Sequence, residues 1–361
     1  GGLSALSRSY GLGIDNVLQF EAVLANGTAV TVDACSYPDL FWALRGGGGG
    51  SFAVVTAVTY RLHPASPLVE LHLVIDVSDE DNPSAAGALR AFYHKWVDVN
   101  VEGLDRRWGG YWQLSVGYGL MYFLGTEAEA RATLVTNLED WKEALPTSQA
   151  QRINFYVVPK PLGYVHSRTL NMETDVTGYD EFYVGSRLVP EAAVVGNNGA
   201  DGKALLDALL DAGFVEFTAY QLGGKVTDVA ADATAISPVM RSAIWSVISD
   251  PTLAVALLQQ NLTGSAPCYN HHQINEPGDW AEEFWGANLP RLNEIKAAYD
   301  PERRLNCWHC VGFQDFVVGV DNVSNASSVS SSAGAQFHHA VQFLHVVLPS
   351  VLAFALTSAF A

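Results

Sequence analysis

Five consecutive glycines at positions 46 to 50 suggest chemistry, because glycine-rich turns let a backbone approach a nucleotide closely. In the dinucleotide-binding fingerprint a strand precedes the glycines and a helix follows them, which presents a helix N-terminus to the pyrophosphate. Here the order is reversed, because residues 38–45 have a helical pattern and residues 52–62 form a β-branched run. The glycines therefore predict a flexible turn or a close backbone approach to a ligand, and not a dinucleotide-type phosphate loop.

Cys307 and Cys310 form a Cys-x-x-Cys motif, which occurs in redox pairs and zinc sites. The sequence has no second pair with zinc-ligand spacing, and a thioredoxin-like pair would begin a helix after a strand. We therefore predict no metal site. The interpretations that stay open are a local disulfide, a disulfide with Cys35 or Cys268, and simple packing.

The elements that position these residues follow from hydrophobic periodicity. Apolar runs over 17–24 and 28–32 flank Ala25-Asn26-Gly27, which predicts a β-hairpin. Further strands are predicted over 68–75, 214–220 and 243–248, and helices over 85–100, 127–145, 203–212 and 281–299. This mixture predicts an α+β fold.

Composition limits the classes of partner. The 361 residues are 49% hydrophobic, which is enough for one large or two ordinary domains. Acidic residues outnumber basic ones by 38 to 20, and the formal charge of -18 would repel a phosphate backbone. Nucleic acid is therefore excluded as a predicted partner.

Three segments, in order along the chain, resemble one family. Asp39-Leu-Phe-Trp-Ala-Leu-Arg-Gly-Gly-Gly-Gly-Gly-Ser-Phe-Ala-Val-Val-Thr56 is similar to a signature of p-cresol methylhydroxylase-type FAD domains. Leu6-Ser-Arg-Ser-Tyr-Gly-Leu-Gly-Ile-Asp-Asn-Val17 resembles the segment after the phosphate-binding loop of the same domain. Residues 284–301, followed by Cys307-Trp-His-Cys-Val-Gly312, resemble the closing segment of berberine bridge enzyme-like FAD-linked oxidases.

The resemblance implies a domain layout. Residues 1–64 would be the later half of the FAD-binding domain, and 65–270 a substrate domain whose antiparallel sheet is covered by helices. Residues 271–320 would return to the FAD domain, and 321–361 would be a Ser-rich linker with an apolar anchor signal. The family's phosphate loop and flavin-linking histidine would precede Gly1, so we expect an N-terminally truncated sequence.

The resemblance also implies a cofactor and an activity: FAD accepts hydride from an alcohol-type substrate, and dioxygen is the electron acceptor. A sugar, a benzylic alcohol or an alkaloid would fit, and Trp108, Tyr111, Trp112 and Tyr118 are either pocket or core residues. The expected cofactor contacts are Asp15, Asn16, Val17, Gly46, Gly50, Ser51, Val55 and Asn306. The alternative function is a catalytically inactive cell-surface binding or structural module.

The family often uses a tyrosine in a Tyr-x-Asn motif as its catalytic base, and Pro267-Cys-Tyr-Asn-His-His-Gln273 occupies that region here. Tyr269 is the nearest equivalent, although Cys268 is an alternative aligned position. His271 and His272 would either assist proton transfer or bond a loop backbone. Glu216, on a predicted strand, is the next candidate base.

Glycosylation sequons and the C-terminal tail predict a secreted or cell-surface protein. Glycosylation sequons begin at Asn26, Asn261, Asn322 and Asn325. Small residues at 331–334 precede a short spacer and an apolar run over 341–361 without charged residues. This order predicts a glycosylphosphatidylinositol anchor, with a membrane-spanning helix as the alternative.

Overall fold

The computed structural model of the chain describes residues 1–78, 82–113, 117–162, 185–211, 217–249, 262–268, 280–307 and 309–314. Within these ranges it contains helices and two antiparallel sheets, which confirms the predicted α+β class. None of the helices in these ranges is long and apolar enough to cross a bilayer.

The smaller sheet has the order β2-β1-β3 and is antiparallel throughout. Its strands are β1 (Val17–Val23), β2 (Ala29–Asp33) and β3 (Val54–Tyr60). The predicted hairpin is confirmed, because Gly27 turns the chain with a positive φ of 85° and the Asn26 side chain accepts from the amide of Thr28 at 2.9 Å.

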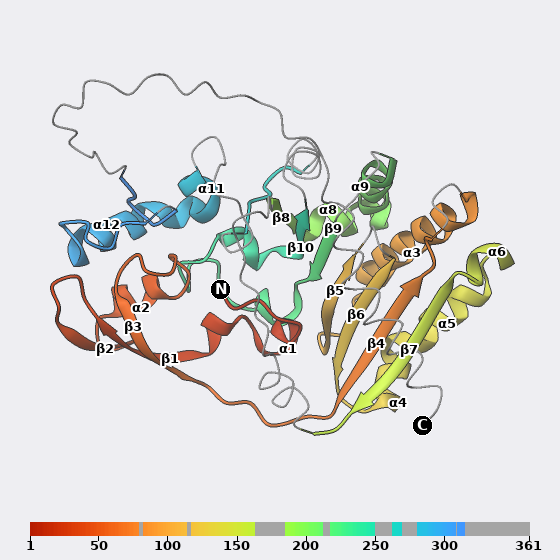
Figure 1. Cartoon of the computed structure of the whole chain (residues 1–361), viewed down its shortest axis with the longest axis horizontal. Coiled ribbons are helices and arrows are strands. Elements are labelled where there is room, and N and C mark those ends of the chain that lie inside the picture. Colours follow the sequence, from red (N-terminus) through yellow and green to blue (C-terminus); the bar gives the residue numbers. More distant parts are fainter. Residues whose placement is uncertain are drawn as a thin grey trace, which may run out of the picture. The chain divides into compact units, whose positions relative to one another are not determined.

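Three helices pack with this sheet into one core, which Figure 1 shows at the red and blue ends of the described chain. They are α2 (Pro38–Leu44), α11 (Trp280–Trp285) and α12 (Leu289–Tyr299). The core joins Phe20 and Trp42 to Phe284 and Leu292, so segments far apart in sequence share one apolar interior. The predicted helix over 281–299 is present as α11 and α12, separated by a short 3-10 turn over Gly286–Asn288.

The larger sheet has seven antiparallel strands in the order β7-β4-β6-β5-β9-β10-β8. They are β4 (Leu68–Ile75), β5 (Trp108–Gln113), β6 (Tyr118–Leu124), β7 (Ile153–Lys160), β8 (Gly185–Pro190), β9 (Phe217–Gln221) and β10 (Ala243–Ser249). Strands β4, β9 and β10 were predicted and β5 to β8 were not. The glycines in β5 and β6 and the Pro159 in edge strand β7 hide the alternation that predicts strands.

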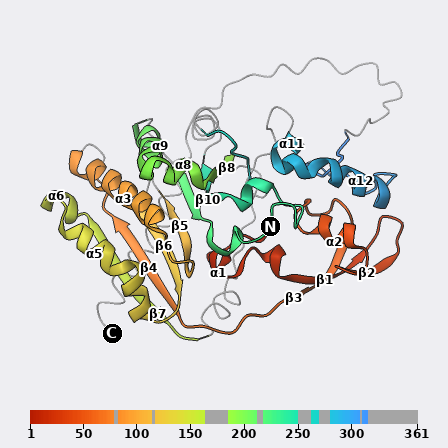
Figure 2. The ribbon, with the colours of Figure 1, turned by 180° about the vertical axis from the view of Figure 1, so that it is seen from behind.

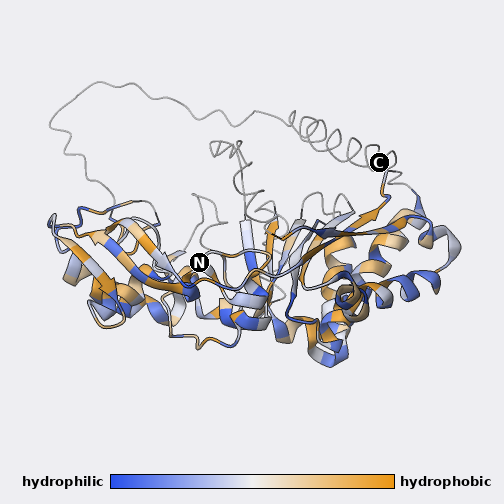
Figure 3. Ribbon diagram, turned by 90° about the horizontal axis from the view of Figure 1, so that it is seen from below, coloured by the Kyte–Doolittle hydropathy of each residue, from blue (hydrophilic) through white to orange (hydrophobic). Residues whose placement is uncertain are grey.

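Helices cover one face of this sheet (Figure 2). They are α3 (Pro83–Glu102), α4 (Glu127–Ala130), α5 (Thr136–Glu143), α6 (Thr147–Ala150), α8 (Glu191–Val195) and α9 (Ala200–Asp211). A π turn joins α4 to α5, so the helix predicted over 127–145 is continuous but locally widened. Apolar and polar residues alternate around the helices in Figure 3, as expected for elements with one buried face.

The first sixteen residues lie on the opposite face, which we call the open face. Arg8 of helix α1 (Ser7–Tyr10) donates to the carbonyls of Trp108 and Leu104, each at 2.7 Å, and to that of Leu222. Gly109 of β5 meets the carbonyl of Ala5 so closely that a Cβ there would overlap it. The N-terminal segment is therefore held directly on the sheet.

A candidate flavin site at a glycine-lined cavity

A cavity of about 700 Å³ lies beside the glycine run, which is within the usual size range for small-molecule sites. Its walls come from the N-terminal segment, the glycine run, the start of β3, strand β8, helix α11, and residues 236–240 and 267–268. They include Gly1, Gly2, Leu3, Leu12, Ile14, Gly46, Gly48, Gly49, Gly50, Val54, Val55, Leu188, Ile236, Met240, Cys268 and Trp285. Segments from all along the sequence therefore build one site.

The glycine run follows a path that side chains would not allow. Gly46, Gly48 and Gly50 have φ values of 129°, 97° and 72°. A Cβ at Gly46 would overlap the backbone of Ile236, whereas a Cβ at Gly49 would meet nothing within 4 Å. The carbonyl of Gly46 also accepts from the indole nitrogen of Trp285 at 3.0 Å. The run is thus a fixed cavity wall rather than a flexible turn.

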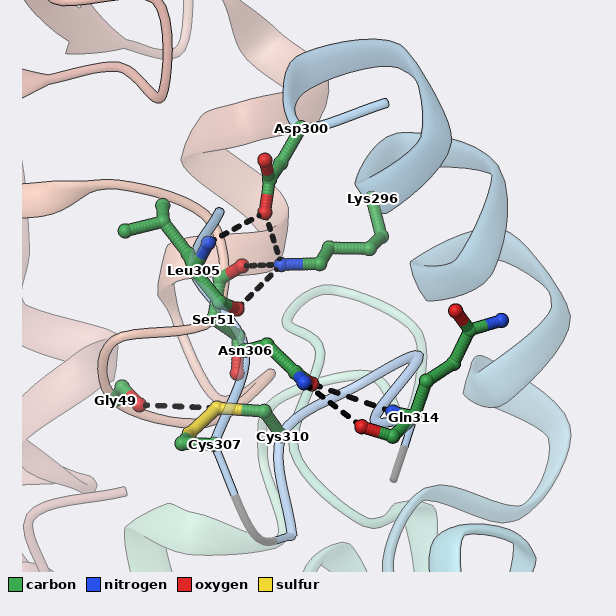
Figure 4. The surroundings of a disulfide bond; sticks show 9 residues. All are labelled: Gly49, Ser51, Lys296, Asp300, Leu305, Asn306, Cys307, Cys310 and Gln314. Atoms are coloured by element: carbon green, nitrogen blue, oxygen red, sulfur yellow. Dashed lines mark hydrogen bonds and ion pairs between the residues drawn. A yellow bond between two sulfur atoms is a disulfide. The ribbon is translucent and has the colours of Figure 1, made fainter. Parts of the chain in front are cut away.

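A buried lysine holds the end of the run (Figure 4). The ammonium of Lys296 donates to the carbonyls of Ser51 and Leu305 at 2.6 and 2.7 Å, and to the carboxylate of Asp300 at 2.6 Å. Burial alone would raise the pKa of Asp300, but hydrogen bonds from Lys296 and from the amides of Leu305 and Arg304 outweigh it and lower that pKa. The Asp300 carboxylate therefore stays ionised at neutral pH, and the hydrogen bonds of Lys296 tie α12 to the run.

Cys307 and Cys310 form a local disulfide, which selects one of the pairings that the sequence left open. The sulfur of Cys310 lies 3.9 Å from the carbonyl of Gly49 (Figure 4), so the bridge packs against the glycine run. Cys35 is exposed, and Cys268 is buried where it lines the cavity.

The structure brings three of the expected cofactor residues together at the cavity: Gly46, Gly50 and Val55. Ser51 follows directly, and its buried hydroxyl has no hydrogen-bond partner among the described residues. Asn306 is not among the lining residues, since its side chain bonds the backbone of Gln314 at 2.8 and 3.3 Å.

The other three expected contacts, Asp15, Asn16 and Val17, are not lining residues. The carboxylate of Asp15 receives two bonds from Arg241, at 2.6 and 2.8 Å. The Asn16 amide donates to the carbonyls of Tyr10 and Leu12, and Val17 belongs to the core under β1. These residues position Leu12 and Ile14, which do line the cavity. Sequence reasoning missed the wall residues that are close only through tertiary contact, such as Leu188 and Met240.

The catalytic candidates Tyr269, His271 and Glu216 lie outside the described residues.

A group of polar side chains lies on the open face of the larger sheet. Of the residues there, the sequence analysis named only the aromatic ones. Trp108 and Trp112 belong to the helix-covered core, whereas Tyr111 and Tyr118 point to the open face. Strand alternation explains this division.

Four polar side chains form a connected group on that face. The carboxylate of Glu70 lies 3.0 Å from Nε2 of His72 and 2.9 Å from the ammonium of Lys160. Nδ1 of His72 lies 3.2 Å from the hydroxyl of Tyr118. A carboxylate only accepts, so Nε2 of His72 donates to Glu70.

The residues at the cavity fit a flavin. Glycines let backbone amides approach a flat ring without Cβ clashes, and apolar Val55 and Leu188 suit its faces. The buried Ser51 hydroxyl is a polar group that a hydrogen-bonding ligand nearby would satisfy.

Comparisons with known proteins find similar flavoproteins. The family model "Berberine and berberine like" matches residues 266–307. The FAD-linked oxidoreductase ffsJ of Aspergillus flavipes is 27% identical over 381 residues, which cover 86% of this chain and 57% of that protein. The chain thus spans little more than half the length of this relative.

Solved structures share the fold. The VAO-type flavoprotein MtVAO615 from Myceliophthora thermophila C1 has a TM-score of 0.68 at 24% identity, covering 86% of this chain and 59% of that one. A chitooligosaccharide oxidase has a TM-score of 0.67 at 18% identity, covering 86% of this chain and 69% of that one. These likenesses show that the described residues share the fold of VAO-type flavoproteins. The chain is also similar to FAD-linked oxidoreductases, and its residues 266–307 match the berberine-like family model; these likenesses support FAD as the cofactor.

Proposed function

We propose that this protein oxidises an alcohol-type substrate, namely a sugar, a benzylic alcohol or an alkaloid. Bound FAD supplies a hydride acceptor at N5 and passes the electrons to dioxygen. The observation that carries the proposal is the cavity of about 700 Å³, whose glycine wall faces residues beside the open face of the larger sheet. A ligand there has a rigid backbone wall on one side and strand residues such as Leu188 on another. The similarity to a chitooligosaccharide oxidase supports an alcohol-type substrate.

The chain's own residues would hold the reactants and take up a proton. Gly46, Gly48 and Gly50 admit the ring, and Val55 limits its movement. Tyr269 remains the proposed acceptor of the substrate hydroxyl proton, with His271 assisting. We expect Tyr269→Phe to slow flavin reduction by substrate about 10²- to 10⁴-fold without changing FAD content. An unchanged rate would move the role to Glu216.

The proposal is tested on the purified full chain. We expect flavin absorbance in the visible range after incubation with FAD and dialysis, and hydrogen peroxide when a substrate alcohol is added under air. A folded protein that remains colourless and leaves added FAD unbound would contradict the proposal. That result would favour the alternative, a catalytically inactive binding or structural module.

We further propose that the protein is secreted, glycosylated and attached to the cell surface by a glycosylphosphatidylinositol anchor. The support is the order of sequons, small residues and apolar tail in the sequence; residues 315–361 lie outside the described ranges. A phospholipase specific for such anchors should release the protein from membranes. Retention after treatment would favour a membrane-spanning tail.

A further inference from the structure

The Cys307–Cys310 disulfide is a redox-active group that the proposed function does not use. It packs against the glycine run, and Figure 4 shows the contact between the sulfur of Cys310 and the carbonyl of Gly49, at 3.9 Å. The two cysteines differ in access, because Cys310 is completely buried and Cys307 is only half-buried. A thiol from outside would therefore reach the sulfur of Cys307 first.

The disulfide supports the glycine run directly. Gly49 lines the cavity and has no side chain, so its backbone makes the contact with the sulfur of Cys310. The turn that carries this sulfur is compact, since the amide of Cys310 donates to the carbonyl of Cys307 at 3.0 Å. The next residue, Val311, is fully buried in the core of the smaller sheet. A displacement of the Cys310 sulfur is therefore passed on to the cavity wall.

The same turn also reaches the run through helix α11. His309 lies between the two cysteines and is buried, and its ring centroid is 4.8 Å from that of Trp280 and 5.3 Å from that of Phe284. The next residue of this helix, Trp285, donates to the carbonyl of Gly46 at 3.0 Å. The turn thus supports the glycine run at two places, directly and through α11.

His309 has a backbone conformation that must be held in place. Its φ of 60° lies in the left-handed region, which is unfavourable for a residue with a Cβ and persists only where the surrounding structure imposes it. The disulfide closes a short ring around His309 and restricts its backbone. Once the bridge is open, His309 is free to leave this conformation and to withdraw its ring from α11.

We propose that the Cys307–Cys310 disulfide is a reversible redox switch in the cavity wall. The disulfide form holds the glycine run in place, and the dithiol form lets the run move and weakens the binding of FAD. The inference rests on the proposed function for its ligand, whereas the movement of the wall is a property of the protein alone.

The reductant is a dithiol, or two molecules of a monothiol. One thiolate attacks the sulfur of Cys307, the bond between the two protein sulfurs breaks, and Cys310 leaves as a thiolate that takes up a proton in its buried surroundings. A second thiolate attacks the mixed disulfide at Cys307, so the reductant leaves as a disulfide and the protein has gained two electrons and two protons.

Reduction changes the packing at the wall. The two sulfur atoms are no longer bonded, so they repel each other and move apart to an ordinary non-bonded contact distance. Cys310 is fully buried and already in contact with Gly49, which leaves no room for its sulfur unless the wall or the turn moves. Because thiols reduce disulfides inside cells and oxidising surroundings preserve them, the switch makes tight FAD binding depend on an oxidising environment.

The test is amide hydrogen exchange of the full chain without FAD, in oxidised and in reduced dithiothreitol. Alkylation and mass measurement should count two more thiols after reduction. We expect exchange at residues 46–50 and 309–313 to become at least about tenfold faster, while strand β4 exchanges as before. FAD affinity should fall by about tenfold, an effect of the size that opening so short a disulfide loop allows. Oxidised glutathione should restore both properties.

Two serine variants separate this disulfide from the other cysteines. Cys307→Ser should show fast exchange and weak FAD binding in either buffer. The matched control is Cys35→Ser, which changes an exposed free cysteine and should keep the full response to reduction. The cycle of reduction and reoxidation uses the unaltered chain, so it decides the question even if Cys307→Ser fails to fold.

Two outcomes would overturn the switch: unchanged exchange in the glycine run after both thiols have appeared, or faster exchange with no loss of FAD affinity. Either of these results, in protein that binds FAD, leaves the proposed function standing. Exchange that responds to reduction in protein that binds no FAD in either buffer would support the movement of the wall and contradict the proposed function alone.

Discussion

At the residue scale, the glycine run shows how a single position can determine the site. Gly46 combines a φ of 129° with backbone contact to Ile236, so any side chain there is both strained and overlapping. Gly49 has neither restriction, since its φ is not positive and the space around its Cβ position is empty. The two residues lie in one loop, but only the position of Gly49 can accept a side chain.

We predict that Gly46→Ala destabilises the fold by at least about 2 kcal/mol and abolishes FAD binding, because the wall must move into the cavity. Gly49→Ala should keep both properties and gain a few tenths of a kcal/mol through lower chain entropy. Urea unfolding and flavin fluorescence titration measure the two effects. If the two variants had equal unfolding free energies and equal FAD affinities, the wall would be flexible.

The Lys296–Asp300 pair makes a pH-dependent prediction. The pKa of Asp300 is lowered in the folded state, so its contribution to stability is complete above the unfolded value near 3.9 and is lost as the pH falls through the folded value. At pH 7 Asp300→Asn should lower the free energy of unfolding by about 3 kcal/mol, because it leaves a buried ammonium without a counter-charge.

The unfolding free energies of the parent and Asp300→Asn should begin to converge below about pH 4, where the carboxyl of the unfolded chain takes up its proton, and should meet only below the lowered folded pKa. The surface variant Glu302→Gln, two residues away and exposed, is the control and should change little at either pH. If the difference in unfolding free energy between the parent and Asp300→Asn stayed the same at low pH, Asp300 would stabilise the fold through packing and not through its charge.

At the element scale, the sequence predicted the elements with clear local signals. The Asn26-Gly27 turn specified its hairpin, and α3 begins with an Asn82 cap and Pro83 and ends at Gly103 with a φ of 91°. Strand β5 was missed because Gly109 and Gly110 break its alternation. The absence of a side chain at these glycines lets other segments pack closely, since a Cβ on Gly109 would overlap Ala5. Such a requirement comes from another segment, so no local pattern reveals it.

The Gly109 contact predicts how the N-terminal segment is held. Gly109→Ala should displace residues 1–10 from β5 at a cost on the order of 1 to 3 kcal/mol, because the new methyl group occupies the place of the Ala5 carbonyl. Faster amide exchange and proteolysis within residues 1–10 would report the displacement. Gln113→Ala, on the same face of β5, should leave that segment protected. Unchanged protection in Gly109→Ala would show that other contacts, such as the hydrogen bonds of Arg8 and Ser9, are enough to hold the segment.

At the scale of the whole molecule, the sequence predicted the fold class and the cofactor through three short segments, but only part of the site. Of the expected cofactor contacts, Gly46, Gly50 and Val55 line the cavity, while Asp15 lies behind it in an ion pair. A resemblance between sequences shows that such residues are shared with a family. It does not show whether a residue contacts the ligand or supports the cavity wall. That distinction depends on Arg241, which is 226 residues away in the sequence.

Asp15 and Arg241 join the two segments that carry Leu12 and Ile14 on one side and Ile236 and Met240 on the other. The side chains of Arg241 and Asp15 are 4% and 7% exposed, and Arg241 also donates to the Thr234 hydroxyl at 2.9 Å. Removing either charge leaves the other uncompensated, so Asp15→Asn and Arg241→Met should each cost about 3 to 5 kcal/mol.

If the pair supports the wall, both single variants should weaken FAD binding alike. The double variant should be less destabilised than the sum of the singles, because it leaves no lone buried charge. If instead Asp15 bound FAD directly, Arg241→Met would retain FAD affinity while Asp15→Asn lost it. Unfolding free energies and FAD dissociation constants of the four proteins therefore distinguish a supporting residue from a contact residue, and additive losses would reject the coupling of the pair.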